Sequence, residues 1–191
     1  MNPLSVGLAI TGSFCTFDRL LGQIPALQQR GMEITPILSF NAAGLDTRFG
    51  KAEDFRQRLV ALTGHEPLLT LTDVEPIGPK KMFDVLVVAP CTGSTLGRLA
   101  CGISDTPVSL AVKSHLRRSR PVVLAVSTND ALGGSMRNVS LLKNTKHIFF
   151  VPLRQDDPVA KPNSLVADFA RIGDTVDAAL RGEQIQPLFC S

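Results

Sequence analysis

The segment from Asp84 to Asp105, with the sequence DVLVVAPCTGSTLGRLACGISD, constrains the fold of this chain most strongly. Its short, β-branched apolar run Val85–Ala89 is typical of a strand in a parallel sheet that is covered on both faces. Small hydroxylated residues follow Pro90, and we expect a helix to begin near Thr95. Such a loop and helix N-terminus suit an anion, because free N–H groups and the positive end of the helix dipole meet there. An ordinary turn with a Ser or Thr cap explains the same residues without a ligand.

The rest of the chain alternates apolar runs with helical patterns, which predicts βαβ units around a parallel sheet with helices on both faces. At 191 residues and 44% hydrophobic content, we expect one α/β domain over residues 1–191. The expected strands are residues 4–10, 33–39, 85–89, 121–126 and 147–151. The expected helices run from the first turn to about 30, from 46 or 47 to about 62, from about 95, from 107 to about 118, and from 164 to 180. Residues 65–83 are the least regular, with a possible short strand at 68–71 and a helical turn at 80–83.

Composition and cysteine spacing narrow the classes of function. The net charge of +3 permits an anionic ligand. The sequence has no stripe of Lys and Arg residues of the kind that binds nucleic acid. Its one basic cluster, at residues 115–120, fits a helix C-terminus. Cys15, Cys91, Cys101 and Cys190 lack metal-site spacing, so we expect free thiols in a reducing cytoplasm and no metal. The N-terminus lacks the pattern of an export signal, and no apolar run approaches the roughly 20 residues of a membrane span.

Four polar loops follow the expected strands at the same edge of the sheet. They are residues 11–14, 39–41, 90–95 and 127–130. Ligands of open α/β sheets bind at that edge, where the strand order reverses, so the joint placement indicates a mononucleotide-like ligand. The first loop has one glycine, Gly12, in place of a GxGxxG pattern, which favours a single phosphate over a dinucleotide.

These loops resemble a known family. Gly12-Ser13 after the first strand, Pro90–Thr95 with the downstream Gly102–Asp105, and the PVVLA strand leading to Asn129 are similar to the homo-oligomeric flavin-containing Cys decarboxylase superfamily. The resemblance spans about residues 4–152. It implies a three-layer, flavodoxin-like (Rossmann-like) sheet, FMN bound between subunits, and assembly into trimers or into dodecamers built from them.

Within that superfamily, three segments are most similar to the B-subunit family of dipicolinate synthase. They are GSFCTF at residues 12–17, the run at 89–108, and STNDALGGSMRN at 127–138. The resemblance implies a separate A subunit with a nicotinamide-binding domain, so that NAD(P) enters only through the partner. It also implies an oxidoreductase that forms pyridine-2,6-dicarboxylate from dihydrodipicolinate during sporulation and is inactive without the A subunit.

The resemblance and the loop chemistry together predict the site residues. Those expected around FMN are Gly12, Ser13, Phe14, Ser39, Pro90, Cys91, Thr92, Ser94, Thr95 and Ser127. Asn129 is expected to contact the ring edge or the substrate, as the candidate catalytic residue. A dicarboxylate substrate needs cationic donors, for which Arg137, and Lys113 or Arg117 of a neighbouring subunit, are candidates.

The chain also departs from its superfamily. The position of the decarboxylase histidine falls on Pro76, and the nearest upstream histidine, His65, is expected in a loop. The decarboxylase PxMN segment is Val126–Asn129 here, and the Glu/Arg/Lys set of the prenyltransferases has no counterpart that we can place. Two alternatives therefore stay open: a non-catalytic scaffold subunit, and a stand-alone FMN-dependent decarboxylase or prenyltransferase-type enzyme.

Overall fold

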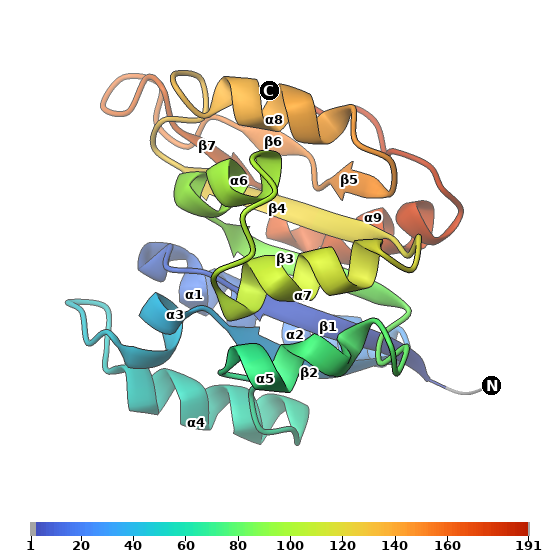
Figure 1. Ribbon diagram of the computed structural model, residues 1–191. Coiled ribbons are helices and arrows are strands. Elements are labelled where there is room, and N and C mark those ends of the chain that lie inside the picture. Colours follow the sequence, from blue (N-terminus) through green and yellow to red (C-terminus); the bar gives the residue numbers. More distant parts are fainter. Residues whose placement is uncertain (1–2, 191) are drawn as a thin grey trace.

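The computed structural model describes residues 3–190 and is built around a mostly parallel, twisted sheet (Figure 1). Its strands are β1 (Leu4–Ile10), β2 (Met32–Leu38), β3 (Val85–Cys91), β4 (Val122–Thr128), β5 (Ile148–Phe150), β6 (Leu153–Arg154) and β7 (Leu165–Ala167). The order is β2-β1-β3-β4-β7-β6, and β5 also pairs with β4. All pairs among β1 to β5 are parallel, while β7 is antiparallel to both β4 and β6. The five expected parallel strands are confirmed.

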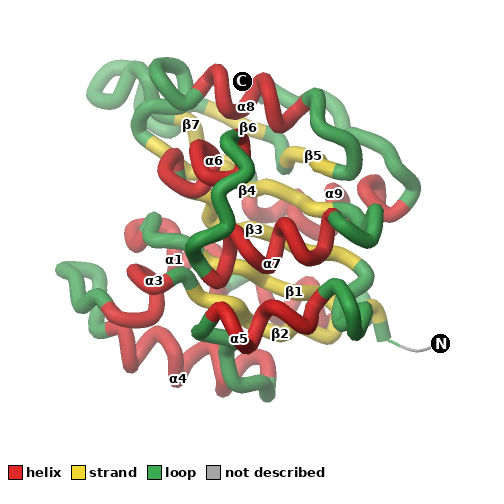
Figure 2. The backbone as a smooth tube through the Cα atoms, viewed as in Figure 1, coloured by secondary structure: helices red, strands yellow, loops and turns green. Residues whose placement is uncertain are grey.

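Helices cover both faces of this sheet. The α-helices are α1 (Phe17–Leu21), α2 (Ile24–Gln29), α3 (Phe40–Gly44), α4 (Ala52–Thr63), α5 (Leu71–Val74), α6 (Gly93–Ala100), α7 (Pro107–Leu116), α8 (Met136–Lys143) and α9 (Ile172–Leu180). In Figure 2, α6 and α7 lie in front of the sheet and α2 and α9 behind it, which confirms the three-layer α/β arrangement. Within residues 3–190, no helix is long and apolar enough to cross a bilayer.

The central strands read as continuous apolar runs because both of their faces are buried. Every residue of β3 is buried, and so are the first six residues of β4. Their Val, Leu and Ala side chains join those of the flanking helices in one continuous core. Parallel strands between two helix layers have no solvent-facing side, so they lack the polar alternation of a half-exposed strand.

The expected terminal helix over residues 164–180 is wrong in its first half. Leu165–Ala167 form β7, a 3-10 turn follows at Phe169–Arg171, and α9 begins only at Ile172. Asp168, not Asn163 or Ser164, caps the turn, since its carboxylate accepts the N–H of Ala170 at 3.2 Å. Pairing with the end of β4 overrides the helical pattern, because it satisfies the backbone of a buried apolar triplet.

Two other helix predictions and one strand prediction need correction. The helix expected up to residue 30 is divided into a 3-10 turn, α1 and α2, and Gly31 follows with a positive φ of 82°. The helix expected from 46 or 47 begins at Ala52, although the Asp46 carboxylate does accept the N–H of Ala52, at 2.9 Å. The possible strand at 68–71 is reduced to one bridge, between Leu68 and Ile37. Sequence reasoning missed the short helices α3, α5 and α8.

The order of the strands reverses between β1 and β3. From β1 the chain moves to β2 on one side and later to β3 on the other, so the connections leave the carboxyl ends of β1 and β3 in opposite directions. A crevice opens at such a point in flavodoxin-like sheets. Thr11 holds its two sides together, since its hydroxyl donates to the carbonyl of Pro90 at 2.7 Å and accepts the N–H of Thr92 at 3.0 Å.

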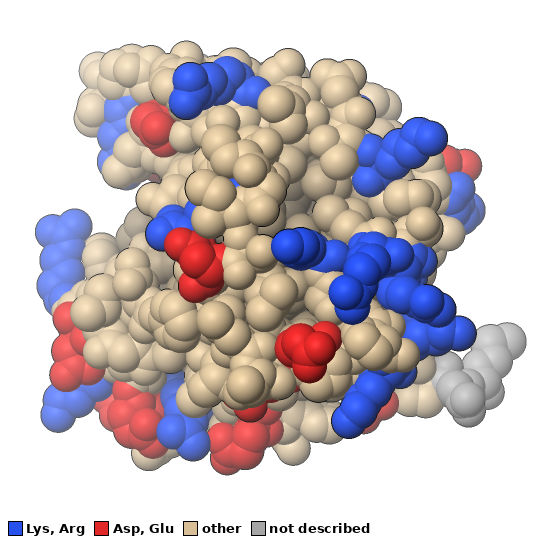
Figure 3. Space-filling view, viewed as in Figure 1, with Lys and Arg blue, Asp and Glu red and all other residues tan. Residues whose placement is uncertain are grey.

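The basic cluster at residues 115–120 lies at the carboxyl end of α7, as expected, and Lys and Arg side chains gather there in Figure 3. His115 is an exception, because it is buried and its Nε2–H donates to the carbonyl of Pro121 at 3.1 Å. Burial lowers the pKa of His115 to about 4, so the ring is neutral at pH 7.

A first prediction concerns the packing of β1. A Cβ built on Gly7 would lie 2.6 Å from side-chain atoms of both Leu86 and Phe83, whereas one built on Gly44 would meet nothing within 4 Å. We expect Gly7→Ala to lower the free energy of unfolding by about 1–3 kcal/mol. Gly44→Ala should change it by less than about 1 kcal/mol. Urea unfolding followed by circular dichroism measures both, since the chain has no Trp or Tyr; equal stabilities would contradict the packing described.

A second prediction concerns acid stability. A histidine with a folded-state pKa of about 4 and an ordinary pKa near 6.5 stabilises the fold fully above pH 6.5 and loses that contribution as the pH falls toward 4. The total is roughly 3 kcal/mol. His115→Gln should therefore flatten the fall in unfolding free energy between pH 7 and 4, measured by urea titrations at each pH. An unchanged fall in His115→Gln would contradict the buried, neutral ring described above.

Candidate functional site

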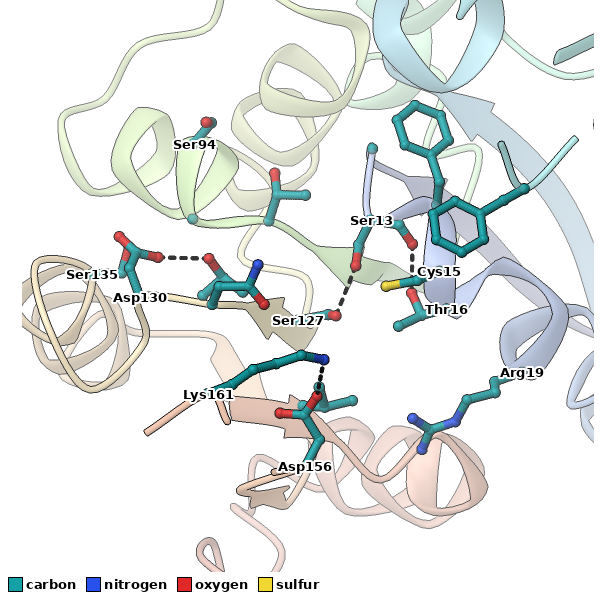
Figure 4. A pocket seen from close by; sticks show the side chains of 18 of the residues that line it. Ser13, Cys15, Thr16, Arg19, Ser94, Ser127, Asp130, Ser135, Asp156 and Lys161 are labelled. Carbon is teal, nitrogen blue, oxygen red and sulfur yellow. Dashed lines mark hydrogen bonds and ion pairs between the residues drawn. The ribbon is translucent and has the colours of Figure 1, made fainter. Parts of the chain in front are cut away.

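A cavity of about 910 Å³ lies at the carboxyl ends of β1, β3 and β4 (Figure 4). Its walls are the loops that follow these strands, together with the segment between β6 and β7. Cavities that hold cofactors and other small ligands have volumes of this order. The crevice expected from the strand order is therefore a real cavity at the expected edge of the sheet.

Seven of the predicted site residues line this cavity. They are Gly12, Ser13, Phe14, Thr92, Ser94, Ser127 and Asn129. The hydroxyls of Ser13 and Ser127 lie 2.8 Å apart and form a hydrogen bond across the cavity, so the loops after β1 and β4 meet there. Hydroxyl and amide donors from three separate loops thus face one volume.

The other four predicted residues lie outside the cavity lining. Ser39 caps α3, since its hydroxyl accepts the N–H of Ala42 at 3.3 Å. Pro90 and Cys91 are buried within β3, and burial raises the pKa of the Cys91 thiol far above its ordinary value. The Thr95 hydroxyl is buried behind Thr92, 3.1 Å from that residue's hydroxyl. These four support the cavity walls.

The amino end of α6, which the sequence suggested as an anion site, is already capped and faces a carboxylate of the chain. The Thr92 side chain caps it by accepting the N–H of Thr95 at 3.4 Å. A Cβ built on Gly93 would lie 2.8 Å from a carboxylate oxygen of Asp130, so this helix end already faces a negative charge of the chain itself. Only glycine leaves room for that approach.

Asp130 remains ionised at neutral pH. Its carboxylate accepts hydrogen bonds from the hydroxyls of Thr128, at 2.6 Å, and Ser135, at 2.8 Å. The bond from Thr128 contributes most to holding the pKa of Asp130 below its ordinary value, and the bond from Ser135 adds to it. A ligand phosphate placed beside Asp130 would be repelled, so the loop after β1 is the better phosphate position.

Three cations line the cavity that sequence reasoning did not select: Arg19 on α1, Arg48 in the turn before α4, and Lys161 between β6 and β7. Arg19 carried a usable signal, because it lies only six residues beyond Ser13, one helical turn into the segment after the first loop. Arg48 and Lys161 carried none, since both lie in irregular segments far from the recognised motifs.

The cations that sequence reasoning did select for a dicarboxylate do not line the cavity. Arg137 is exposed on α8, and Arg117 is exposed just beyond α7. Lys113 is also exposed and donates to the hydroxyl of Ser104 at 3.3 Å. The role of Arg137 as a carboxylate donor, and that of Lys113 or Arg117 in a neighbouring subunit's site, stay predictions.

No histidine is among the residues that line the cavity in the described part of the chain. Pro76, at the position of the decarboxylase histidine, lies in a 3-10 turn at Glu75–Ile77. His65 lies in the loop after α4, as expected, 3.3 Å from a carboxylate oxygen of Glu33. The site thus has donors and charged groups for binding and orientation, and lacks an imidazole for proton transfer.

Comparisons with known proteins agree with this geometry. Residues 1–181 match the model of the flavoprotein family. The chain is 42% identical over 183 residues to the B subunit of dipicolinate synthase from Bacillus subtilis, covering 96% of this chain and 92% of that protein. The crystal structure of the corresponding B subunit from Bacillus halodurans superposes with a TM-score of 0.90 at 38% identity, covering 100% of this chain and 99% of that one.

A more distant structure shares the fold alone. The FMN-dependent cysteine decarboxylase SpaF has a TM-score of 0.69 at 22% identity, over 94% of this chain and 97% of that one. The flavodoxin-like architecture is thus shared with that decarboxylase. By its matched sequence and its fold, this chain belongs to the flavoprotein family.

Proposed function

We propose that this chain is the B subunit of dipicolinate synthase, that it binds FMN, and that it works with a nicotinamide-binding A subunit to form pyridine-2,6-dicarboxylate from dihydrodipicolinate during sporulation. The observation that carries the proposal is the 42% identity to a protein of that name over 96% of this chain. The cavity supports it, because its donors come from the three loops in which the family resemblance lies.

The residues of the cavity fit FMN. The volume of about 910 Å³ suits a mononucleotide, and the rings of Phe14 and Phe49 offer apolar surface to a flat ring system. Gly12 and Ser13 would hold the phosphate, since the loop after β1 carries no acidic side chain and Asp130 faces the end of α6 instead. Thr92, Ser94 and the loop after β4 would then face the ring.

The reaction converts a dihydropyridine into an aromatic pyridine by loss of one hydride equivalent and one proton. FMN, when bound, supplies two-electron redox chemistry of this kind. The chain's own residues would bind and orient: Ser127 and Asn129 present a hydroxyl and an amide at the end of β4, and Phe14 shields one side of the cavity from water. We assign Asn129 to the ring edge or the substrate.

We further propose that the chain acts as a homo-oligomer, a trimer or a dodecamer, with the FMN site completed by a neighbouring subunit. Exposed apolar side chains lie at or near the cavity mouth, among them Phe49 with 52% exposure and Leu132 with 39%. Apolar side chains beside a ligand site are suited to contact with another subunit. Small dicarboxylates, the A subunit and further copies of this chain are then its expected partners.

The second candidate function is a scaffold subunit that shapes the active site of the A subunit without redox chemistry of its own. The observation that favours it is the lack of a histidine among the residues lining the cavity in the described chain. Asp130, which has a lowered pKa, is a weak proton acceptor in place of such a histidine.

A third prediction tests the phosphate position. Ser13→Ala removes a hydroxyl that would donate to the FMN phosphate, and a hydrogen bond to a charged group contributes about 1.5–3 kcal/mol. FMN affinity should therefore fall about tenfold to a hundredfold, measured by titration of FMN fluorescence. Thr95→Val is the matched control, because that hydroxyl lies behind Thr92, and it should cause a smaller loss. A larger loss for Thr95→Val would place the phosphate at α6.

A fourth prediction tests the function itself. Pyridine-2,6-dicarboxylate should form from dihydrodipicolinate only when FMN-loaded chain and A subunit are combined, as followed by the absorbance of the aromatic product. Equal activity of the pair without FMN would support the scaffold function. Activity of this chain alone on a carboxylated or prenylated substrate would support a stand-alone enzyme of the decarboxylase or prenyltransferase type.

A further inference from the structure

One region of the cavity, outside the residues assigned to FMN, holds two cations, Arg19 and Lys161, and the carboxylate of Asp156, which pairs with Lys161. We propose that Arg19 and Lys161 bind the two carboxylates of the substrate and of the aromatic product, one carboxylate each. This inference rests on the proposed function for the identity of the dicarboxylate. The cations themselves, their positions and their partners come from the structure.

Arg19 is held in place without being neutralised. It projects from α1 into the cavity, and its guanidinium carbon lies 5.5 Å from the centre of the Phe169 ring. A cation–π contact orients the group and leaves its N–H donors available. Within residues 3–190, no carboxylate lies within ion-pair distance of Arg19, unlike Arg30 and Arg98, which do form ion pairs. A planar guanidinium with open donors suits bidentate binding of a carboxylate.

Lys161 belongs to an ordered loop between β6 and β7. Its backbone N–H donates to the carbonyl of Asp157 at 2.8 Å, and its carbonyl accepts the N–H of Ser164 at 3.0 Å. Its ammonium lies 3.2 Å from a carboxylate oxygen of Asp156. An ammonium group has three N–H donors, so the bond to Asp156 fixes its position and leaves two donors for a ligand.

The two cations approach the same space from different walls. Figure 4 shows Arg19 and Lys161 pointing into one part of the cavity from opposite sides, below the bond between Ser13 and Ser127. Asp130 lies toward the α6 end, away from Arg19. A pyridine-2,6-dicarboxylate carries its carboxylates on either side of the ring nitrogen, so it requires cationic donors from two directions. One cation would suffice for a monocarboxylate.

The test measures binding, so that it does not depend on turnover. Titration calorimetry of the full chain, with and without FMN, would use pyridine-2,6-dicarboxylate and pyridine-2-carboxylate as probes. The variants are Arg19→Gln and Lys161→Gln, with Arg118→Gln as the matched control, because Arg118 is exposed beyond α7, outside the cavity lining. FMN affinity is measured in parallel for each variant.

We expect wild-type chain to prefer the dicarboxylate, and each cavity variant to bind it at least about tenfold more weakly, the effect of one lost charge-assisted bond. FMN affinity should stay within about twofold, and Arg118→Gln should match wild type in both measurements. The variants should also lose most of the preference for the dicarboxylate over the monocarboxylate.

Three results would overturn the inference: wild-type chain that does not bind the dicarboxylate, variants that bind it as tightly as wild type, or a parallel loss of FMN that assigns these cations to the phosphate. A failure of FMN to bind is a separate result. Wild-type chain that binds the dicarboxylate but not FMN would refute the proposed role of the flavin. It would still leave Arg19 and Lys161 as the residues that bind the dicarboxylate.

Discussion

The position of the site depends on Thr11, at the point where the sheet changes direction. The strands β1 and β3 end side by side, and their following segments diverge beyond a single long backbone bond, from the Thr11 N–H to the Pro90 carbonyl at 3.3 Å. The buried Thr11 hydroxyl fixes one loop against the other through the carbonyl of Pro90 and the N–H of Thr92. Loss of this side chain would remove the partner of the Thr92 N–H and leave the Pro90 carbonyl with only the longer bond from the Thr11 N–H, at 3.3 Å. The orientation of Ser13 and of α6 against each other follows from this contact.

Negative charge inside the site then determines how a nucleotide can lie in it. A helix N-terminus after a small-residue loop suggests a phosphate site from sequence, yet here the approach of Asp130 to Gly93 reserves that end of the cavity for groups without negative charge. In the orientation that we propose for FMN, the phosphate therefore lies at the loop after β1 and not at the helix end that the Asp84–Asp105 segment suggests. The same segment still forms the cavity wall, through Thr92 and Ser94.

The parallel strands were predictable because burial on both faces leaves an unbroken apolar run, and the helix ends at Gly31, Gly64 and Pro107 carry strong local signals. The strand β7 was not predictable, since a buried apolar triplet such as Leu165–Ala167 suits a helix equally well until its partner strand is known. The loops that form the site were predictable, because the carboxyl ends of parallel strands lie at the same edge of the sheet. Arg48 and Lys161 were not predictable, because only the folded chain brings their distant segments to the cavity, whereas Arg19 lies close to the first loop in sequence.

The composition of the cavity fits a protein that binds and orients more than one that transfers protons. Its charged groups in the described chain are three cations and two carboxylates, and each carboxylate is already occupied, Asp130 by two hydroxyls and Asp156 by Lys161. Aromatisation of a dihydropyridine releases a proton as well as a hydride equivalent, and a carboxylate with a lowered pKa accepts a proton poorly. In the reaction that we propose, a chain of this kind would leave that proton to solvent or to the A subunit, which would give a physical reason for two different chains to share it.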